Sequence, residues 1–169
     1  MKKIAHNIVL IGMPGSGKSF VGKELAKALA MGFFDTDEQI ESLYGRIPDL
    51  FQIGEDHFRR IETKVLAQLL ASAKGVISTG GGIVTREENI SLMKKAGIVF
   101  FLDRHVELIM GNPELQNRPL LAGQQTRQKL EALYRQRYKL YVKAADFIID
   151  NNGTLDLTLN QIQSRLSMT

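Results

Sequence analysis

The chain has 169 residues, a length that suits one domain, and we predict a single domain over residues 1–169. It contains no cysteine, which excludes disulfides, thiolate metal sites, iron–sulfur clusters and cysteine nucleophiles. There are 22 basic and 18 acidic residues, and the formal net charge of +4 suits an anionic small molecule or a nucleic acid. No apolar run approaches the roughly 18–20 residues of a membrane span, so we predict a cytoplasmic protein that does not contact a membrane.

Short apolar segments alternate with helical patterns along the chain. Near-continuous apolar strands separated by helices are typical of an α/β fold with a parallel sheet covered on both faces. Residues 111–125 are rich in Gly, Pro, Asn and Gln and lack periodicity, which is typical of a functional loop such as a lid. The predicted strands are 7–11, 33–34, 75–78, 98–102 and 147–149, and the predicted helices lie near 18–31, 55–72, 87–95, 104–111, 126–143 and 154–166.

A glycine-rich segment follows the first predicted strand and reads Gly-Met-Pro-Gly-Ser-Gly-Lys-Ser over residues 12–19. It satisfies the pattern Gly-x4-Gly-Lys-Ser/Thr in the strand–loop–helix setting that a phosphate-binding loop requires. Its backbone amides would surround a phosphate, Lys18 would reach the β- and γ-phosphates, and Ser19 would coordinate Mg²⁺. ATP is favoured, because the Asn-Lys-x-Asp motif of GTPases is missing from the sequence. The predicted ATP-binding residues of this segment are Gly12, Gly15, Ser16, Gly17, Lys18 and Ser19.

Two carboxylates, Asp35 and Asp37, follow the second predicted strand. Residues two apart in an extended segment point to the same side, so both should leave the carboxyl end of the strand together. One could hold Mg²⁺ through water, and the other could accept a proton from a hydroxyl group. The alternative is that one of them only caps the helical pattern at 38–44.

Two arginines interrupt apolar helical stripes. Arg59 lies three residues before Glu62 on a face that continues into Leu66, so Glu62 could orient its planar fork toward a carboxylate. Arg137 breaks a stripe that includes Leu133 and should likewise face inward. The alternative for any charged helix position is a solvated surface, and that interpretation suits three neighbours better: Arg60, Arg135 and Lys139.

Two loops supply further candidates. Gly80, Gly81 and Gly82 end the third predicted strand and would allow the backbone to approach a ligand closely. Arg118, in the lid segment, could close over the phosphates and stabilise charge during transfer. Asp103 and the Asp150 turn also end apolar strands, but neither has the sequence context of a metal site, and we interpret both as structural.

Together, these motifs resemble the shikimate kinases, a family of small P-loop kinases of aromatic amino-acid biosynthesis. The resemblance runs from about residue 7 to residue 150, and the pieces occur in the family's order. The P-loop is specific by itself, whereas the others are specific as an ordered set. They are Phe-x-Asp-x-Asp at 33–37, Gly-Glu-x-x-Phe-Arg-x-x-Glu at 54–62, Thr-Gly-Gly-Gly at 79–82, Arg-Pro-Leu-Leu at 118–121 and Arg-x-x-Leu-Tyr at 137–141.

The resemblance implies a three-layer fold with five parallel strands in the order 2-3-1-4-5, a lid near 111–125 and a substrate-binding region near 36–62. It implies Mg²⁺-dependent transfer of a phosphoryl group from ATP to shikimate. We also predict that the protein is a monomer and does not bind nucleic acid. Asp35 resembles the water-mediated Mg²⁺ ligand, and Asp37 the candidate base that holds the ring hydroxyls. The implied catalytic residues are Lys18, Asp37 and Arg118, and the implied shikimate ligands are Asp37, Arg59, Gly80, Gly81, Gly82 and Arg137.

The chain departs from the family's pattern at three positions. Lys139 stands where many members have proline, and Lys143 where an acidic residue is common. Gly111 occupies the position of an arginine that lies near the adenine in some members, so the adenine contacts are not carried over. The alternatives are a related small-molecule kinase of the gluconate type and a non-catalytic ATP-binding regulatory module. A nucleic-acid binder is a weaker alternative that only the basic segment 127–143 supports.

Overall fold

The computed structural model describes residues 6–169, and within this range five parallel strands form one sheet in the order β2-β3-β1-β4-β5. All five predicted strands and their order are confirmed, with each strand end within one residue of its predicted position. The strands are β1 (Asn7–Ile11), β2 (Gly32–Asp35), β3 (Gly75–Ser78), β4 (Gly97–Asp103) and β5 (Phe147–Asp150).

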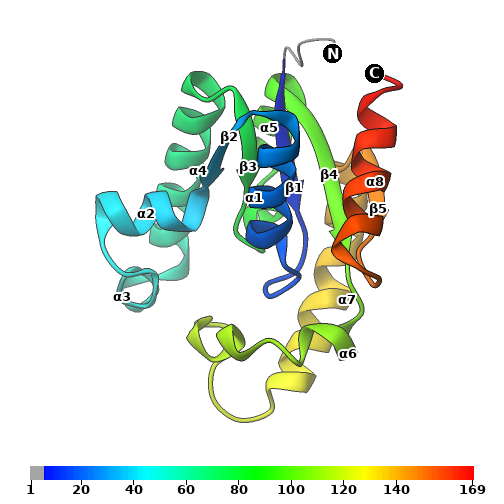
Figure 1. Ribbon diagram of the computed structural model, residues 1–169. Coiled ribbons are helices and arrows are strands. Elements are labelled where there is room, and N and C mark those ends of the chain that lie inside the picture. The colour runs from blue at the N-terminus through cyan, green and yellow to red at the C-terminus, as the bar shows by residue number, and fades with distance from the viewer. Residues whose placement is uncertain (1–5) are drawn as a thin grey trace.

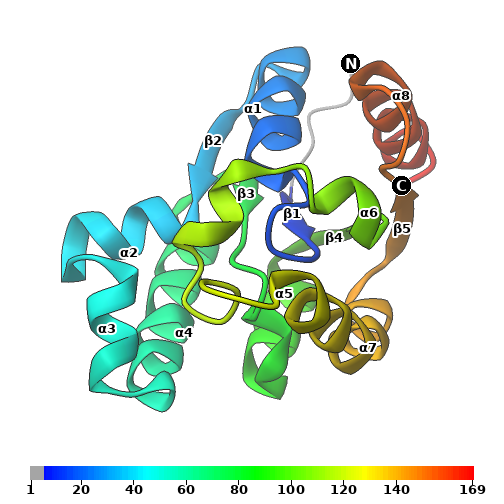
Figure 2. The ribbon, with the colours of Figure 1, turned by 90° about the horizontal axis from the view of Figure 1, so that it is seen from below.

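Helices cover both faces of the sheet and complete three layers (Figures 1 and 2). Successive side chains of a strand point to opposite faces, so β1 contributes to two cores. Ile8 and Leu10 pack toward α1 (Lys18–Leu29) and α8 (Leu155–Leu166). Val9 and Ile11 belong to the larger core on the other face, under α4 (Glu55–Ser72), α5 (Glu87–Ala96) and α7 (Thr126–Ala144). No helix formed by residues 6–169 combines the length and apolarity needed to cross a membrane.

The sequence patterns missed or misjudged several short segments, three of which lie near the site. Helix α3 (Ile47–Ile53) was not predicted, because its seven residues are too few for a 3.6-residue period to show. The helix predicted at 104–111 is wrong in length: α6 covers only Val106–Ile109, and the following Asn112 is extended before Pro113. The predicted lid contains a 3-10 helix, η2 (Pro113–Asn117), that lacks a recognisable pattern.

The candidate functional residues gather at the carboxyl ends of the strands, the lower edge of the sheet in Figure 1. The phosphate-binding loop follows β1, Asp35 ends β2, and the Gly80–Gly82 loop follows β3. Helices α2 (Thr36–Tyr44) and α3 lie on one side of this edge, and α6, η2 and the start of α7 lie below it (Figures 1 and 2). Open parallel sheets bind ligands in this position.

Candidate active site

The phosphate-binding loop has the backbone of an anion site. Gly15 and Gly17 have φ values of 74° and 87°, in the left-handed region that glycine adopts without steric strain. The N–H groups of Gly15, Gly17 and Lys18 make no hydrogen bond to any described residue, and they precede or begin the twelve-residue helix α1. Free N–H groups at a helix N-terminus attract phosphate.

Lys18 is buried and bonded to its own loop. Its Nζ donates to the carbonyl oxygens of Gly12 at 2.9 Å and of Met13 at 2.8 Å. Burial and, to a smaller extent, the nearby positive charge of Arg118 lower the pKa of Lys18 to about 7. A bound polyphosphate would supply the negative charge that this ammonium group lacks in the unliganded protein.

Asp35 caps helix α2 and also accepts a hydrogen bond from the phosphate-binding loop. Its Oδ1 accepts hydrogen bonds from the backbone N–H groups of Asp37 at 2.9 Å and Glu38 at 3.3 Å, which makes it the N-cap of α2. Its Oδ2 accepts a hydrogen bond from the hydroxyl of Ser19. The expectation that Asp35 and Asp37 share an extended segment was wrong, because α2 begins at Thr36 between them. Both side chains nevertheless line the cavity that contains Lys18 and Ser19.

The oxygen atoms of Ser19 and Asp35 fit a magnesium site of the kind that nucleotides complete. Magnesium prefers oxygen ligands and commonly takes one or two from the protein, with substrate phosphates and waters supplying the rest. No group of three or more His, Cys, Asp or Glu residues within 6–169 is arranged to hold a metal ion without such help. The two residues predicted as metal ligands therefore lie together, in a setting that requires a phosphate ligand.

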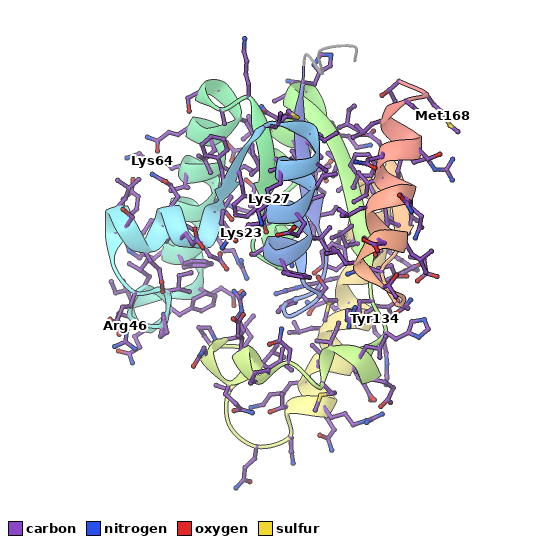
Figure 3. All side chains as sticks on the ribbon, viewed as in Figure 1. Lys23, Lys27, Arg46, Lys64, Tyr134 and Met168 are labelled. Atoms are coloured by element: carbon purple, nitrogen blue, oxygen red, sulfur yellow. The ribbon has the colours of Figure 1, made fainter. Side chains whose placement is uncertain are left out.

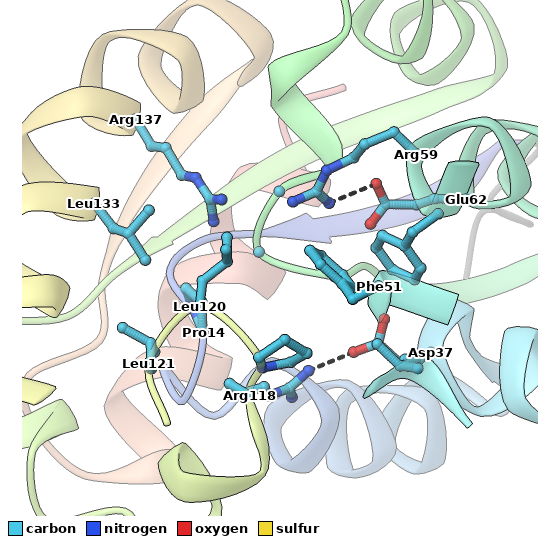
Figure 4. Close-up of a pocket in the computed structure, with 16 residues that line it drawn as sticks. Pro14, Asp37, Phe51, Arg59, Glu62, Arg118, Leu120, Leu121, Leu133 and Arg137 are labelled. Atoms are coloured by element: carbon cyan, nitrogen blue, oxygen red, sulfur yellow. Dashed lines mark hydrogen bonds and ion pairs between the residues drawn. The ribbon is translucent and has the colours of Figure 1, made fainter. Parts of the chain in front are cut away.

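Arg118 forms an ion pair with Asp37. Its NH1 is 2.5 Å from Asp37 Oδ2, although 81 residues separate the two in the sequence (Figure 4). The sequence prediction placed Arg118 over the phosphates, whereas in this structure it lies between two cavities and lines both of them. Asp37 also lines both, so this pair occupies the junction of the cavity that contains Lys18 and Ser19, here called the phosphate cavity, and a second cavity, here called the acceptor pocket.

The acceptor pocket lies beyond that junction and is lined by both helix arginines predicted as ligands, Arg59 and Arg137. Arg59 is oriented by acidic neighbours on α4: its NH1 is 2.8 Å from Glu62 Oε2, and its NH2 is 3.3 Å from Glu55 Oε1. Glu62 is completely buried, and this burial raises its pKa against the opposing effect of Arg59. Its pairing with Arg59 shows that the two residues share one face of α4, as their spacing predicts. The pocket is lined by Pro14, Asp37, Ile47, Phe51, Phe58, Arg59, Glu62, Gly80, Gly81, Gly82, Arg118, Pro119, Leu120, Leu121, Leu133 and Arg137.

Arg137 is a buried cation that lacks a counterion. Its side chain is on α7, points into the pocket toward Arg59 (Figure 4), and is only 3% exposed. It makes no ion pair with any residue in 6–169, and its buried Nε has no hydrogen-bond partner there. An unpaired buried charge is strongly unfavourable, so a residue in this position indicates an anionic ligand. Arg60, Arg135 and Lys139, predicted to lie on the surface, are exposed.

The three glycines after β3 allow the pocket to be this compact. A Cβ atom at Gly82 would lie 2.3 Å from both terminal nitrogens of Arg59. One at Gly81 would lie 2.6 Å from the ring of Pro14, and one at Gly80 would lie 2.8 Å from Glu62 Oε1. Close backbone approach to a ligand was predicted for these glycines, and the structure shows their close approach to three side chains that line the pocket: Arg59, Pro14 and Glu62.

Sequence reasoning missed the aromatic walls of the pocket. The rings of Phe51 and Phe58 lie 4.5 Å apart, and the Arg59 guanidinium carbon is 5.6 Å and 5.2 Å from their centroids. Phe58 stands in the Phe-Arg pair of the motif and could have been assigned from it. Phe51 lies on the unpredicted helix α3, so no periodic signal pointed to it.

The sequence analysis also missed a side chain that supports the phosphate loop, Asn151. Asn151, in the segment interpreted as a simple turn, donates from Nδ2 to the Ser16 carbonyl at 2.7 Å and accepts from the Thr158 hydroxyl at 2.8 Å. Asn151 also lines a cavity beside the loop, together with Phe20, Leu108 and Gly111. The segment thus supports the loop and adjoins the space where a nucleotide base could extend.

A parallel sheet in the order 2-3-1-4-5, a P-loop after its central strand and an acceptor pocket at the same edge define a small P-loop kinase. A family model described as shikimate kinase matches residues 14–167 of the chain. A curated shikimate kinase of Clostridium beijerinckii is 39% identical over 159 residues, which cover 94% of this chain and 93% of the relative. The chain therefore belongs to the shikimate kinase family.

Solved structures show the same relationship. The shikimate kinase from Acinetobacter baumannii in complex with shikimate has a TM-score of 0.92 and 38% identity, and the match covers 97% of this chain and 94% of that one. A gluconokinase from Sinorhizobium meliloti has a TM-score of 0.58 and 17% identity, with 99% of this chain and 98% of that one covered. The second likeness shows a shared fold only.

Proposed function

We propose that this protein transfers the γ-phosphoryl group of ATP to shikimate, forming shikimate 3-phosphate on the route to chorismate and the aromatic amino acids. The observation that carries this proposal is Arg137, a buried guanidinium without a counterion, which faces Arg59 across a pocket that opens onto the phosphate loop. A small acid with ring hydroxyls fits this arrangement, because one end needs a carboxylate and the other a phosphoryl acceptor. Family membership and the shikimate-bound neighbour support the same substrate.

Different walls of the pocket would bind the carboxylate, the ring and the reacting hydroxyl of shikimate. Arg59 and Arg137 would bind the carboxylate, with Glu62 keeping the Arg59 fork in place. Phe51 and the lid leucine Leu120 supply apolar surface for the ring. The Gly80–Gly82 backbone adds close contacts, and the hydroxyl that reacts would lie against Asp37 at the junction with the phosphate cavity.

The transfer requires a proton acceptor and charge neutralisation. A bond forms between the ring oxygen and the γ-phosphorus as the bond to the β–γ bridging oxygen of ATP breaks, and Asp37 takes the hydroxyl proton. Lys18 and Arg118 would balance the charge of the transferring group. ATP binding would draw Arg118 away from Asp37 toward the phosphates and leave the carboxylate free to act. Magnesium held by Ser19 and, through water, by Asp35 would supply further neutralisation and orient the phosphates.

The test is ADP release in the presence of ATP and Mg²⁺ with shikimate, with gluconate or without an acceptor. We expect rapid release with shikimate alone and much slower release with GTP in place of ATP. Release with gluconate would keep the fold and the phosphate loop but reassign the acceptor pocket. ATP binding without acceptor-dependent turnover would contradict the proposal and favour a regulatory module.

A further inference from the structure

Tyr141 is a completely buried polar side chain that the proposed mechanism leaves unassigned. It lies on α7, one turn after Arg137, and its ring stacks on Phe101 with centroids 4.9 Å apart. Its hydroxyl donates to the carbonyl oxygen of Gly81 at 2.6 Å and lies 3.7 Å from the sulfur of Met13. Three segments that are distant in sequence meet at this one oxygen atom: the arginine-bearing helix, the acceptor loop and the phosphate loop.

The bond to Gly81 controls a peptide that faces the acceptor. The carbonyl of Gly81 and the N–H of Gly82 belong to the same planar peptide unit, so fixing one fixes the direction of the other. The N–H group of Gly82 donates to no residue within 6–169, although Gly82 lines the acceptor pocket. The peptide therefore has one end bound to the Tyr141 hydroxyl and a free donor at the other.

Contacts on the other side of Gly81 leave this peptide little room to move. A Cβ atom at Gly81 would lie 2.6 Å from the ring of Pro14, so the loop backbone already touches the phosphate loop. Packing of an aromatic ring alone does not require a hydroxyl at position 141. Burial raises the pKa of Tyr141 to about 12, so the hydroxyl remains a donor throughout the physiological pH range.

We propose that Tyr141 is a positioning residue for the acceptor. Through the Gly81 carbonyl, its hydroxyl orients the Gly81–Gly82 peptide toward shikimate and holds it in register with Arg137 on the same helix. The inference rests on the proposed function, because the acceptor that the peptide faces is the one assigned above. The residue acts on acceptor binding and leaves the nucleotide contacts unchanged.

The test compares Tyr141→Phe with Tyr138→Phe by steady-state kinetics and calorimetry. Tyr138 lies on the same helix and also packs on Phe101, but its hydroxyl makes no hydrogen bond to another described residue. We expect Tyr141→Phe to raise the KM and Kd for shikimate about tenfold while the KM for ATP changes less than twofold. Tyr138→Phe should leave all three constants within twofold of wild type.

Each other outcome is also decisive. An unchanged shikimate KM in Tyr141→Phe, equal increases in both substrate constants, or complete failure to fold would show that Tyr141 serves the fold only and would overturn the inference. A low yield of folded variant does not obscure the result, because KM does not depend on the concentration of active enzyme. Wild-type protein without shikimate-dependent ADP release would instead contradict the proposed function, and this is measured before any variant is compared.

Discussion

The phosphate side and the acceptor side of the site differ in how far their charged groups are paired within the protein. On the phosphate side, Lys18 bonds to loop carbonyls and Ser19 bonds to Asp35, and at the junction with the acceptor pocket Arg118 bonds to Asp37. On the acceptor side, Arg59 pairs with Glu62 and Glu55, whereas Arg137 makes no ion pair with any residue that the structure describes.

This difference indicates different responses to the two substrates. ATP must displace internal hydrogen bonds before the phosphate side can hold it, so rearrangement should accompany nucleotide binding. Shikimate would enter a pocket in which both arginines are buried and Arg59 is already held by Glu62. A preorganised pocket loses less entropy on binding. Variants on the phosphate side should therefore affect kcat most, and variants on the acceptor side should affect the KM for shikimate.

The largest effect is expected from Lys18→Met. Removing the buried ammonium leaves the transferring phosphoryl group without a principal neutralising charge, and kcat should fall about 1,000-fold. Lys27→Met is the matched control, since Lys27 lies on the outer side of the same helix (Figure 3) and pairs only with Glu24 among the described residues. Initial rates at saturating ATP and shikimate measure the effect. A kcat within tenfold of wild type would contradict the role of Lys18.

Arg137→Ala tests the acceptor side. Loss of a buried charged contact to the carboxylate should raise the KM for shikimate about 100-fold while the KM for ATP stays within threefold. Arg135→Ala controls for the loss of a basic residue from the same helix, because the Arg135 side chain is 79% exposed. If the shikimate KM of Arg137→Ala matched wild type, the carboxylate would bind elsewhere.

Arg118 lines both cavities, so Arg118→Ala tests whether its main effect is on phosphoryl transfer or on acceptor binding. We expect kcat to fall about 30-fold through lost charge stabilisation, whereas the KM for shikimate should be no higher than in wild type because Asp37 is freed. Arg127→Ala is the control, since Arg127 is a surface residue paired with Glu107. A shikimate KM that rises with an unchanged kcat would instead make Arg118 an acceptor ligand.

The smallest effect concerns pH. With a pKa of about 7, Lys18 is mostly neutral at pH 8 in the free protein and becomes protonated beside bound phosphates. Binding should then take up about 0.5–1 proton per ADP at pH 8, and affinity should fall as pH rises above 7. Calorimetry with ADP and Mg²⁺ in two buffers of different ionisation enthalpy measures the uptake. Lys18→Met should abolish it, and uptake that persists in this variant would assign the proton to another group.

The sequence predicted most reliably what is contiguous in the chain. The strand, the glycine-rich loop and the first helix occupy residues 7–29 and could be assigned from local pattern alone, because glycine conformations and apolar periodicity are properties of neighbouring residues. The same logic failed for α3, which is too short to show a period, and for the path between Asp35 and Asp37. There, helix capping prevailed over the extended conformation expected from the preceding strand.

The sequence by itself determined the strands, the phosphate loop and the helix arginines Arg59 and Arg137 that point inward, since each follows from the spacing of neighbouring residues. The tertiary structure alone decided which of them meet. Arg118 reaches Asp37 across 81 residues, and the Tyr141 hydroxyl reaches the Gly81 carbonyl across 60. Such contacts depend on how helices pack against the sheet, and local spacing carries no information about that packing.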